Sequence, residues 1–170
     1  MVDVTMREIL DETMADWSRE RPDLDLAAMG TTLRLNQLMN TALRSIDPLF
    51  AAHGISLGEF DVLAALRRGG DGAVLTPTAL ARVAMVSPAG MTNRLNRLEA
   101  AGFIQRRQDP GDRRGSLVEL TGEGKAVADR AVEDLVEAEN AVFSVLSAAE
   151  LERFDRTIDK LIANIEQRPA

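Results

Sequence analysis

Hydrophobic residues recur at helical spacing over the first third of the chain. The first repeat predicts an amphipathic helix over residues 4–20 and is formed by Met6, Ile9, Leu10, Met14 and Trp17. Pro22 ends that helix, because proline disfavours helical geometry in the residue before it. A second repeat predicts a helix from about Leu26 to Ala52, followed by Gly54 at a left-handed position.

Three helix-start signals follow in the middle of the chain. Each is a capping residue followed by glutamate three positions later or by proline at the next position, and they occur at Ser56–Glu59, Thr76–Pro77 and Ser87–Pro88. They predict a helix ending at about Arg68 and two short helices over about 77–84 and 88–101, the last ending before Gly102.

Two strands and two long helices complete the pattern. Phe103–Gln108 and Gly115–Leu120 have the composition of strands and flank the turn sequence DPGDRR, which predicts a β-hairpin. Thr121 then caps a long helix, and a capping box at Ser147 and Glu150 begins the last one.

This order predicts a mainly α-helical chain with a small β-hairpin, in the α+β class. Two short capped helices followed by a basic hairpin are typical of a winged helix-turn-helix. We interpret the chain as one domain, with an added N-terminal helix (1–25), dimerisation helices (26–53 and 122–168), and a winged helix-turn-helix (56–121) that contains a recognition helix (88–101) and a wing (103–120).

Composition excludes several function classes. The 170 residues include no Cys and a single His, which excludes disulfides and thiol catalysis and disfavours a zinc site. No carboxylate pair with a nucleophile, phosphate loop or metal signature is recognisable, so we expect neither an enzyme nor a resident cofactor. No apolar stretch is long enough to span a membrane and no signal peptide is recognisable, so we expect a cytoplasmic protein without membrane partners.

Charge is unevenly distributed along the chain, whose net charge is −7. Residues 80–115 carry seven Arg and three acidic residues, whereas residues 1–29 and 116–170 have net charges of −5 and −6. An acidic body repels a polyanion everywhere except at this central segment. A merely solvated run of charges remains the alternative.

The predicted helix 88–101 has two distinct faces. At about 100° per residue, Met91, Leu95 and Leu98 form a core stripe. The opposite face is small, polar and cationic, and consists of Ala89, Thr92, Asn93, Asn96 and Arg97. Asn and Arg can bond base edges in a major groove, and Ser87 lies at the helix N-terminus, where free N–H groups attract phosphate. An ordinary surface helix is the alternative.

The hairpin turn supplies two further arginines, Arg113 and Arg114. A narrow wing that carries arginine can reach the minor groove, where negative potential is concentrated. We expect Asp112 to orient Arg114 through an ion pair, with a solvent-exposed turn as the alternative. The long flanking helices suit burial against a second copy, which would place two recognition helices about one DNA turn apart on a palindromic operator.

Three segments of the chain resemble the MarR family of bacterial transcription regulators. They are LGEFDVLAALRR, TPTALARVAMVSPAGMTNRLNRLEAAGFIQRR and DPGDRRGSLVELTGEGK, and the last holds the wing signature of Asp112 and Arg114 followed by Leu120 and Thr121. The resemblance covers about residues 30–165. It implies a homodimer that binds DNA through winged helices and is released by a small ligand.

The added N-terminal helix and its tryptophan are similar to the urate-responsive branch of that family, which includes PecS-type and uricase-regulator proteins. That resemblance implies an effector site for urate, or a related purine such as xanthine, formed by Trp17, Asp61, Arg94 and Arg106. Urate is a flat anion suited to an arginine, a carboxylate that accepts N–H bonds, and an aromatic wall.

Other roles for these four residues stay open. Trp17 can be a hydrophobic anchor, Asp61 and Arg106 can form a structural ion pair, and Arg94 can contact phosphate. The sequence therefore predicts a ligand-responsive regulator, most simply a repressor. The alternatives are a MarR-type regulator that responds to a phenolic or other aromatic acid, and an architectural DNA-binding protein without a ligand.

Overall fold

The computed structural model describes residues 5–168 and, for Arg113 and Arg114, the backbone alone. The chain divides into two compact units at the peptide between Pro48 and Leu49. No cis peptide bond occurs in the part of the chain that the structure describes.

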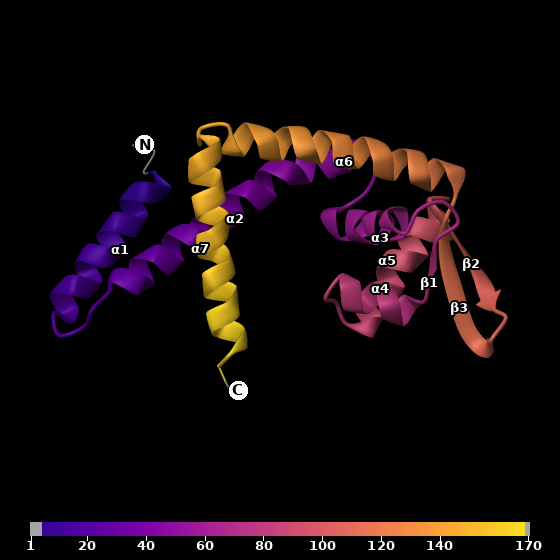
Figure 1. Cartoon of the computed structure of the whole chain (residues 1–170), viewed down its shortest axis with the longest axis horizontal. Helices are drawn as coiled ribbons and strands as arrows, with labels where there is room; N and C mark the ends of the chain where they lie inside the picture. Colours follow the sequence, from indigo (N-terminus) through magenta and orange to yellow (C-terminus); the bar gives the residue numbers. More distant parts are fainter. Residues whose placement is uncertain (1–4, 169–170) are drawn as a thin grey trace. The chain divides into compact units, whose positions relative to one another are not determined.

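The first unit is helical and contains α1 (Met6–Glu20) and most of α2 (Ala27–Ala52) (Figure 1). Both helices confirm the predictions from hydrophobic spacing. Thr5 begins α1 with a capping box to Glu8, because the Thr5 hydroxyl accepts from the Glu8 N–H and the Glu8 carboxylate accepts from the Thr5 N–H.

The second unit contains the remaining helices and the sheet. Its helices are α3 (Leu57–Arg68), α4 (Pro77–Val83), α5 (Pro88–Ala100), α6 (Gly122–Phe143) and α7 (Ala148–Glu166). The three-stranded antiparallel sheet has the order β1-β3-β2, formed by Val74–Leu75, Asp112–Leu120 and Ile104–Asp109 respectively. This is the predicted winged helix-turn-helix, with β1 as an additional strand that the sequence pattern did not indicate.

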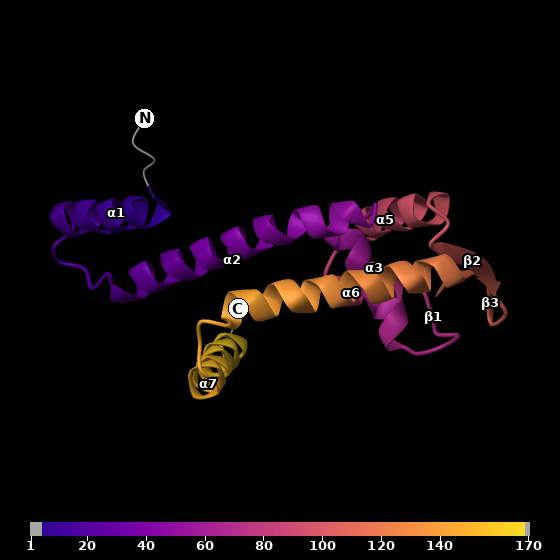
Figure 2. The same ribbon diagram turned by 90° about the horizontal axis from the view of Figure 1, so that it is seen from above.

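The hydrophobic core of the second unit lies between α3, α5, α6 and the sheet. Its fully buried side chains include Leu63, Leu66, Leu80, Met91, Leu95, Leu98 and Val118. In Figure 2, seen from above, α6 passes across α3, and the two helices are in contact. Phe50, near the end of α2, packs on Phe60 of α3 with ring centroids 4.8 Å apart, which anchors that end of α2 to the core.

The helix boundaries follow the capping residues. Ser56, Thr76, Ser87, Thr121 and Ser147 all have extended backbone geometry and accept a bond from an N–H of the helix that follows. All five caps confirm the sequence predictions.

The hairpin differs from the sequence prediction in one respect. The prediction left DPGDRR as a turn between two strands, but β3 already begins at Asp112 and the turn itself is Pro110–Gly111. The strands are longer because their pairing continues through Gln108 and Ser116 and, after an irregularity in register, joins Asp109 to Asp112. Arg113 and Arg114 therefore belong to a strand rather than to the turn.

Candidate nucleic-acid interface and effector residues

Helix α5 has the two faces that the helical wheel predicts. Met91, Leu95 and Leu98 are each about 1% exposed and point into the core. The opposite face is solvent-exposed and consists of Ala89, Thr92, Asn93, Asn96 and Arg97. Ser87 caps the helix by accepting from the Gly90 N–H at 3.2 Å. The second short helix of the helix-turn-helix thus presents a polar, cationic surface with no acidic residue among those five positions.

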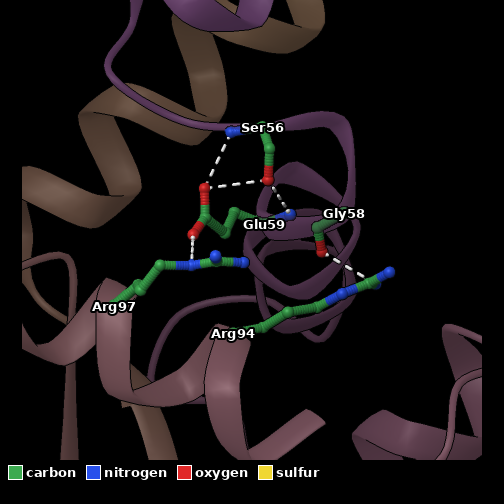
Figure 3. Close-up of polar contacts among 5 residues, drawn as sticks. All are labelled: Ser56, Gly58, Glu59, Arg94 and Arg97. Carbon is green, nitrogen blue, oxygen red and sulfur yellow. Dashed lines mark hydrogen bonds and ion pairs between the residues drawn. The ribbon is translucent and has the colours of Figure 1, made fainter. Parts of the chain in front are cut away.

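Arg97 is held by a carboxylate from α3 (Figure 3). Its Nε donates to Oε1 of Glu59 at 2.7 Å. The other oxygen of Glu59 accepts from the N–H of Ser56 at 2.8 Å and from its hydroxyl at 2.9 Å. One carboxylate therefore both caps the first turn of α3 and holds an arginine of α5.

These bonds keep Glu59 ionised. Burial raises the pKa of this carboxyl, but the bonds from Ser56 and the positive charge and hydrogen bond of Arg97 outweigh burial and lower it below its ordinary value. The Glu59 side chain is 10% exposed, whereas that of Arg97 is 66% exposed. The pair therefore joins a buried anion to a cation on the surface.

Arg94 lies beside this pair and turns toward α3 (Figure 3). Its Nη1 donates to the Gly58 carbonyl at 3.0 Å and lies 3.8 Å from the Asp61 carboxylate. Burial raises the pKa of Asp61, while the charges of Arg94 and Arg68 oppose that rise. The structure thus brings together two of the four predicted effector residues, Asp61 and Arg94.

Arg106 lies on another side of α5. Its Nη2 donates to Oδ1 of Asn96 at 2.5 Å, and its Nε lies 3.2 Å from the Glu99 carboxylate without hydrogen-bond geometry. Asn96 and Glu99 lie about 200° and 140° around α5 from Arg94, at about 100° per residue. The structure therefore pairs Asp61 with Arg94, and not with Arg106 as one alternative had it.

The fourth predicted effector residue, Trp17, belongs to the first unit. It lies on α1, with 45% of its surface exposed. Exposure of this size in a single chain leaves the indole available for contact, which is compatible both with an aromatic wall for a ligand and with a hydrophobic anchor.

The wing residues are placed only in part. Arg113 and Arg114 lie on β3, and their side chains are outside the described part of the chain. The predicted ion pair between Asp112 and Arg114 therefore stays a prediction. At the base of the wing, Nε of Arg107 lies 3.5 Å from the Glu119 carboxylate.

Sequence reasoning missed the long-range partners of these residues. Glu59 was identified as a capping residue, but its bond to Arg97, 38 positions away, has no periodic signal. His53 lies just after α2, and its Nε2 is 2.7 Å from Oδ2 of Asp134 on α6. Such contacts arise only when the folded core brings separate helices together.

Within residues 5–168, no cluster of three or more histidine or acidic side chains has the arrangement of a metal site. No single helix in that range is both long and apolar enough to cross a membrane, and α2 and α3 meet those criteria only as a bent pair.

Comparison with known proteins places the chain in a family. A family model described as the MarR family matches residues 53–115. The chain is 38% identical to the HTH-type transcriptional regulator PecS of Dickeya dadantii, over 83% of this chain and 85% of that protein. The chain belongs to the MarR family. This regulator is also 29% identical to the HTH-type transcriptional repressor YetL of Bacillus subtilis, over 91% of this chain and 87% of that protein.

Solved structures share the fold of this regulator. Wild-type MarR from Escherichia coli, in its apo form, superposes with a TM-score of 0.63 at 28% identity, over 75% of this chain and 93% of that one. A MarR variant from the same organism, in complex with operator DNA, has a TM-score of 0.67 at 24% identity, over 85% and 96% of the two chains. The relatives are named as transcriptional regulators, which are not enzymes.

Proposed function

We propose that this regulator binds a palindromic operator as a homodimer, with α5 in the major groove and the wing at the adjacent minor groove. The observation that carries the proposal is the exposed face of α5, where Asn93 and Arg97 lie on one side of a helix whose other side is buried. Asn and Arg recognise adenine and guanine edges through paired hydrogen bonds. The complex of the Escherichia coli relative with operator DNA supports this use of the fold.

A homodimer accounts for the apolar residues that a single chain leaves exposed. On α2, Met39 is 55% exposed, and on α7, Ile162 and Ile165 are 49% and 67% exposed. Residues of this kind on flanking helices suit burial against a second copy, and two-fold symmetry would then present two α5 helices to two half-sites.

The effector that we propose is urate or a related purine anion. We also propose that the protein acts as a repressor. Arg94 lies on α5 itself and contacts the Gly58 carbonyl and Asp61 of α3. An anion that binds Arg94 competes with these contacts and shifts α5 against α3. A coupling of about 1–3 kcal/mol between the two sites changes the affinity for DNA by about 5- to 150-fold. Trp17 and Arg106 complete the proposed effector set.

A cavity in the second unit favours a second candidate effector, an aromatic acid. The cavity has a volume of about 410 Å³ and lies between α3 and α6. Its apolar walls are formed by Phe60, Ala64, Ala128, Val132 and Leu135, while Arg67 and Arg68 supply cationic groups. An open apolar pocket with arginine at its edge suits a benzoate-type anion.

The experiment that tests operator binding is a fluorescence-anisotropy titration of the purified protein on DNA from upstream of its own gene. We expect a dissociation constant of roughly 10⁻⁸–10⁻¹¹ M for a palindrome in that DNA, and at least about 10³-fold weaker binding to a scrambled duplex. Equal affinity for both duplexes would contradict the proposal and favour an architectural protein.

Variants at different positions distinguish the two proposed effectors. Urate or xanthine should weaken operator binding by the wild type, and Asp61→Asn should remove that response. An aromatic acid that occupies the cavity should instead lose its effect in Ala64→Leu, which narrows the cavity, and keep it in Trp17→Ala. If neither ligand class changes the affinity for DNA, both effector proposals fail while operator binding stands.

A further inference from the structure

We infer that Glu59 is a positioning residue for DNA specificity, because it fixes the guanidinium of Arg97 in the orientation that reads a base pair. The inference rests on the proposed function and extends it to a residue that lies on α3, outside the reading helix. Among the described residues, Glu59 is the one charged residue that is buried, with 8% of its surface exposed.

The Glu59 carboxylate cannot lose its bond to Arg97 without a large cost in free energy. Its Oε2 is used by both donors of Ser56, and its Oε1 faces the Nε of Arg97. Removing the arginine leaves a largely buried anion with half of its acceptors unpaired, which is strongly unfavourable. The bond to Arg97 is therefore part of the folded core even though the arginine itself is on the surface.

The geometry leaves the reading edge of Arg97 available. Glu59 is bonded by Nε, at the base of the guanidinium, so the four N–H donors on the two terminal nitrogens are left for a further acceptor (Figure 3). Two parallel N–H groups are what the O6 and N7 atoms of guanine accept. Asn93 lies four residues before Arg97, on the same face of α5.

Fixing this side chain in advance has an energetic consequence. A free arginine loses rotamer entropy when it is immobilised on DNA. Since Glu59 already restrains Arg97, less of that loss falls on binding, and the plane of the guanidinium is set before contact. An arginine held in one plane discriminates between base pairs, whereas a mobile one can turn to the nearest phosphate.

A carboxylate can also sequester an arginine from DNA, which is the opposite of positioning it. Two observations favour positioning. The Arg97 side chain is 66% exposed while bonded, so Glu59 does not withdraw it from the surface. The Glu59 anion is itself buried, so it offers DNA little exposed negative charge.

The test compares Glu59→Gln with Glu150→Gln on a set of operator duplexes that carry every single base-pair substitution. In Glu59→Gln, the amide oxygen can keep the Ser56 donors, which turns the amide NH₂ toward Arg97. Glu150 caps α7 through the same bonds to Ser147 and is the matched control. Arg97→Lys is a second variant that leaves the cap of α3 untouched.

We expect Glu59→Gln and Arg97→Lys to lose roughly tenfold discrimination at the same base pair of each half-site. Affinity for scrambled DNA should be unchanged, and Glu150→Gln should behave as the wild type. Unaltered discrimination in Glu59→Gln, or a uniform gain in affinity for all sequences, would overturn the inference. If the wild type itself does not distinguish operator from scrambled DNA, the proposed function fails first and the inference with it.

Discussion

The guanidinium of Arg94 fills the space where Gly58 has no side chain. A Cβ atom built on Gly58 would lie 2.6 Å from Cζ of Arg94 and 2.7 Å from its Nη2. The missing methyl group therefore allows an arginine of α5 to dock on the first turn of α3 and reach the Gly58 carbonyl. Because the obstructing atoms are the end of a flexible side chain, a methyl group at Gly58 displaces the arginine rather than the backbone.

Gly58→Ala should therefore move Arg94 without unfolding the protein. The higher helix propensity of alanine, worth about 1 kcal/mol, offsets much of the lost hydrogen bond, so the free energy of unfolding should change by about 1 kcal/mol or less. The pKa of Asp61 should rise further, because the positive charge of Arg94 opposes the effect of burial. An NMR titration of the Asp61 carboxyl carbon measures this, and an unchanged pKa would show that Arg94 had not moved.

The contributions of Asp61 and Glu59 to the stability of the protein should change with pH in opposite directions. Burial holds the pKa of Asp61 above its ordinary value of 3.8, so its contribution to stability is complete below that value and is lost as the pH rises through the folded pKa. The pKa of Glu59 is held below its ordinary 4.5, so its contribution is complete above that value and is lost as the pH falls through the folded pKa.

Asp61→Asn should accordingly be more stable than the wild type at neutral pH, with the difference vanishing in acid. Glu59→Gln should be less stable at neutral pH, by about 1–3 kcal/mol, because it loses a charged hydrogen bond to a buried group, and this difference too should vanish in acid. Urea unfolding at fixed protein concentration, repeated over a series of pH values, measures both. Differences of the same sign for the two variants would be inconsistent with the assigned shifts.

Gly124 should be intolerant of any side chain. A Cβ atom there would lie 1.8 Å from the Phe103 carbonyl oxygen, which is backbone and cannot swing away. Gly124→Ala should lower the free energy of unfolding by roughly 1–3 kcal/mol or more. Gly122→Ala is the control two residues earlier in α6, because nothing lies within 4 Å of its Cβ position. Thermal unfolding of the two variants should differ clearly, and equal midpoints would contradict the packing described.

Met85, in the turn between α4 and α5, should be a point of backbone strain. It is the one described non-glycine residue with a positive φ, at 50°, and it is 91% exposed. Met85→Gly removes about 1–2 kcal/mol of left-handed strain. The greater freedom of glycine in the unfolded state costs about 0.5–1 kcal/mol, so the free energy of unfolding should rise by roughly 0.5–1 kcal/mol. Met85→Ala keeps the Cβ atom and should gain nothing, so equal thermal midpoints for the two variants would refute the strain.

The sequence predicted the features of the fold that interactions between nearby residues determine. Helix starts followed from side chains such as Ser87 that bond N–H groups three residues on, and the buried face of α5 followed from the helical period. The two-residue strand β1 was missed because it has no periodicity of its own and exists through pairing of Val74 with Glu119 and Leu75 with Val118.

Side-chain contacts between residues far apart in the sequence could not be predicted from the sequence, for a physical reason. Glu59 bonds Arg97 only because α3 and α5 pack in one core, and neither residue differs in type from a solvated charge. Likewise, the four proposed effector residues have the expected chemistry, yet the structure joins Asp61 to Arg94 and gives Arg106 the partners Asn96 and Glu99. Residue types indicate what chemistry is present, but the packing of helices decides which groups meet.

The most direct test of the central claim is operator binding by Asn93→Ala, measured by anisotropy beside Asn36→Ala. Both asparagines are exposed on helices, but Asn93 lies on the proposed reading face of α5 and Asn36 on α2. We predict a loss of roughly tenfold or more in operator affinity for Asn93→Ala, with wild-type affinity for Asn36→Ala and unchanged binding of both to scrambled DNA. Equal operator affinities for the two variants and the wild type would contradict docking of this face on DNA.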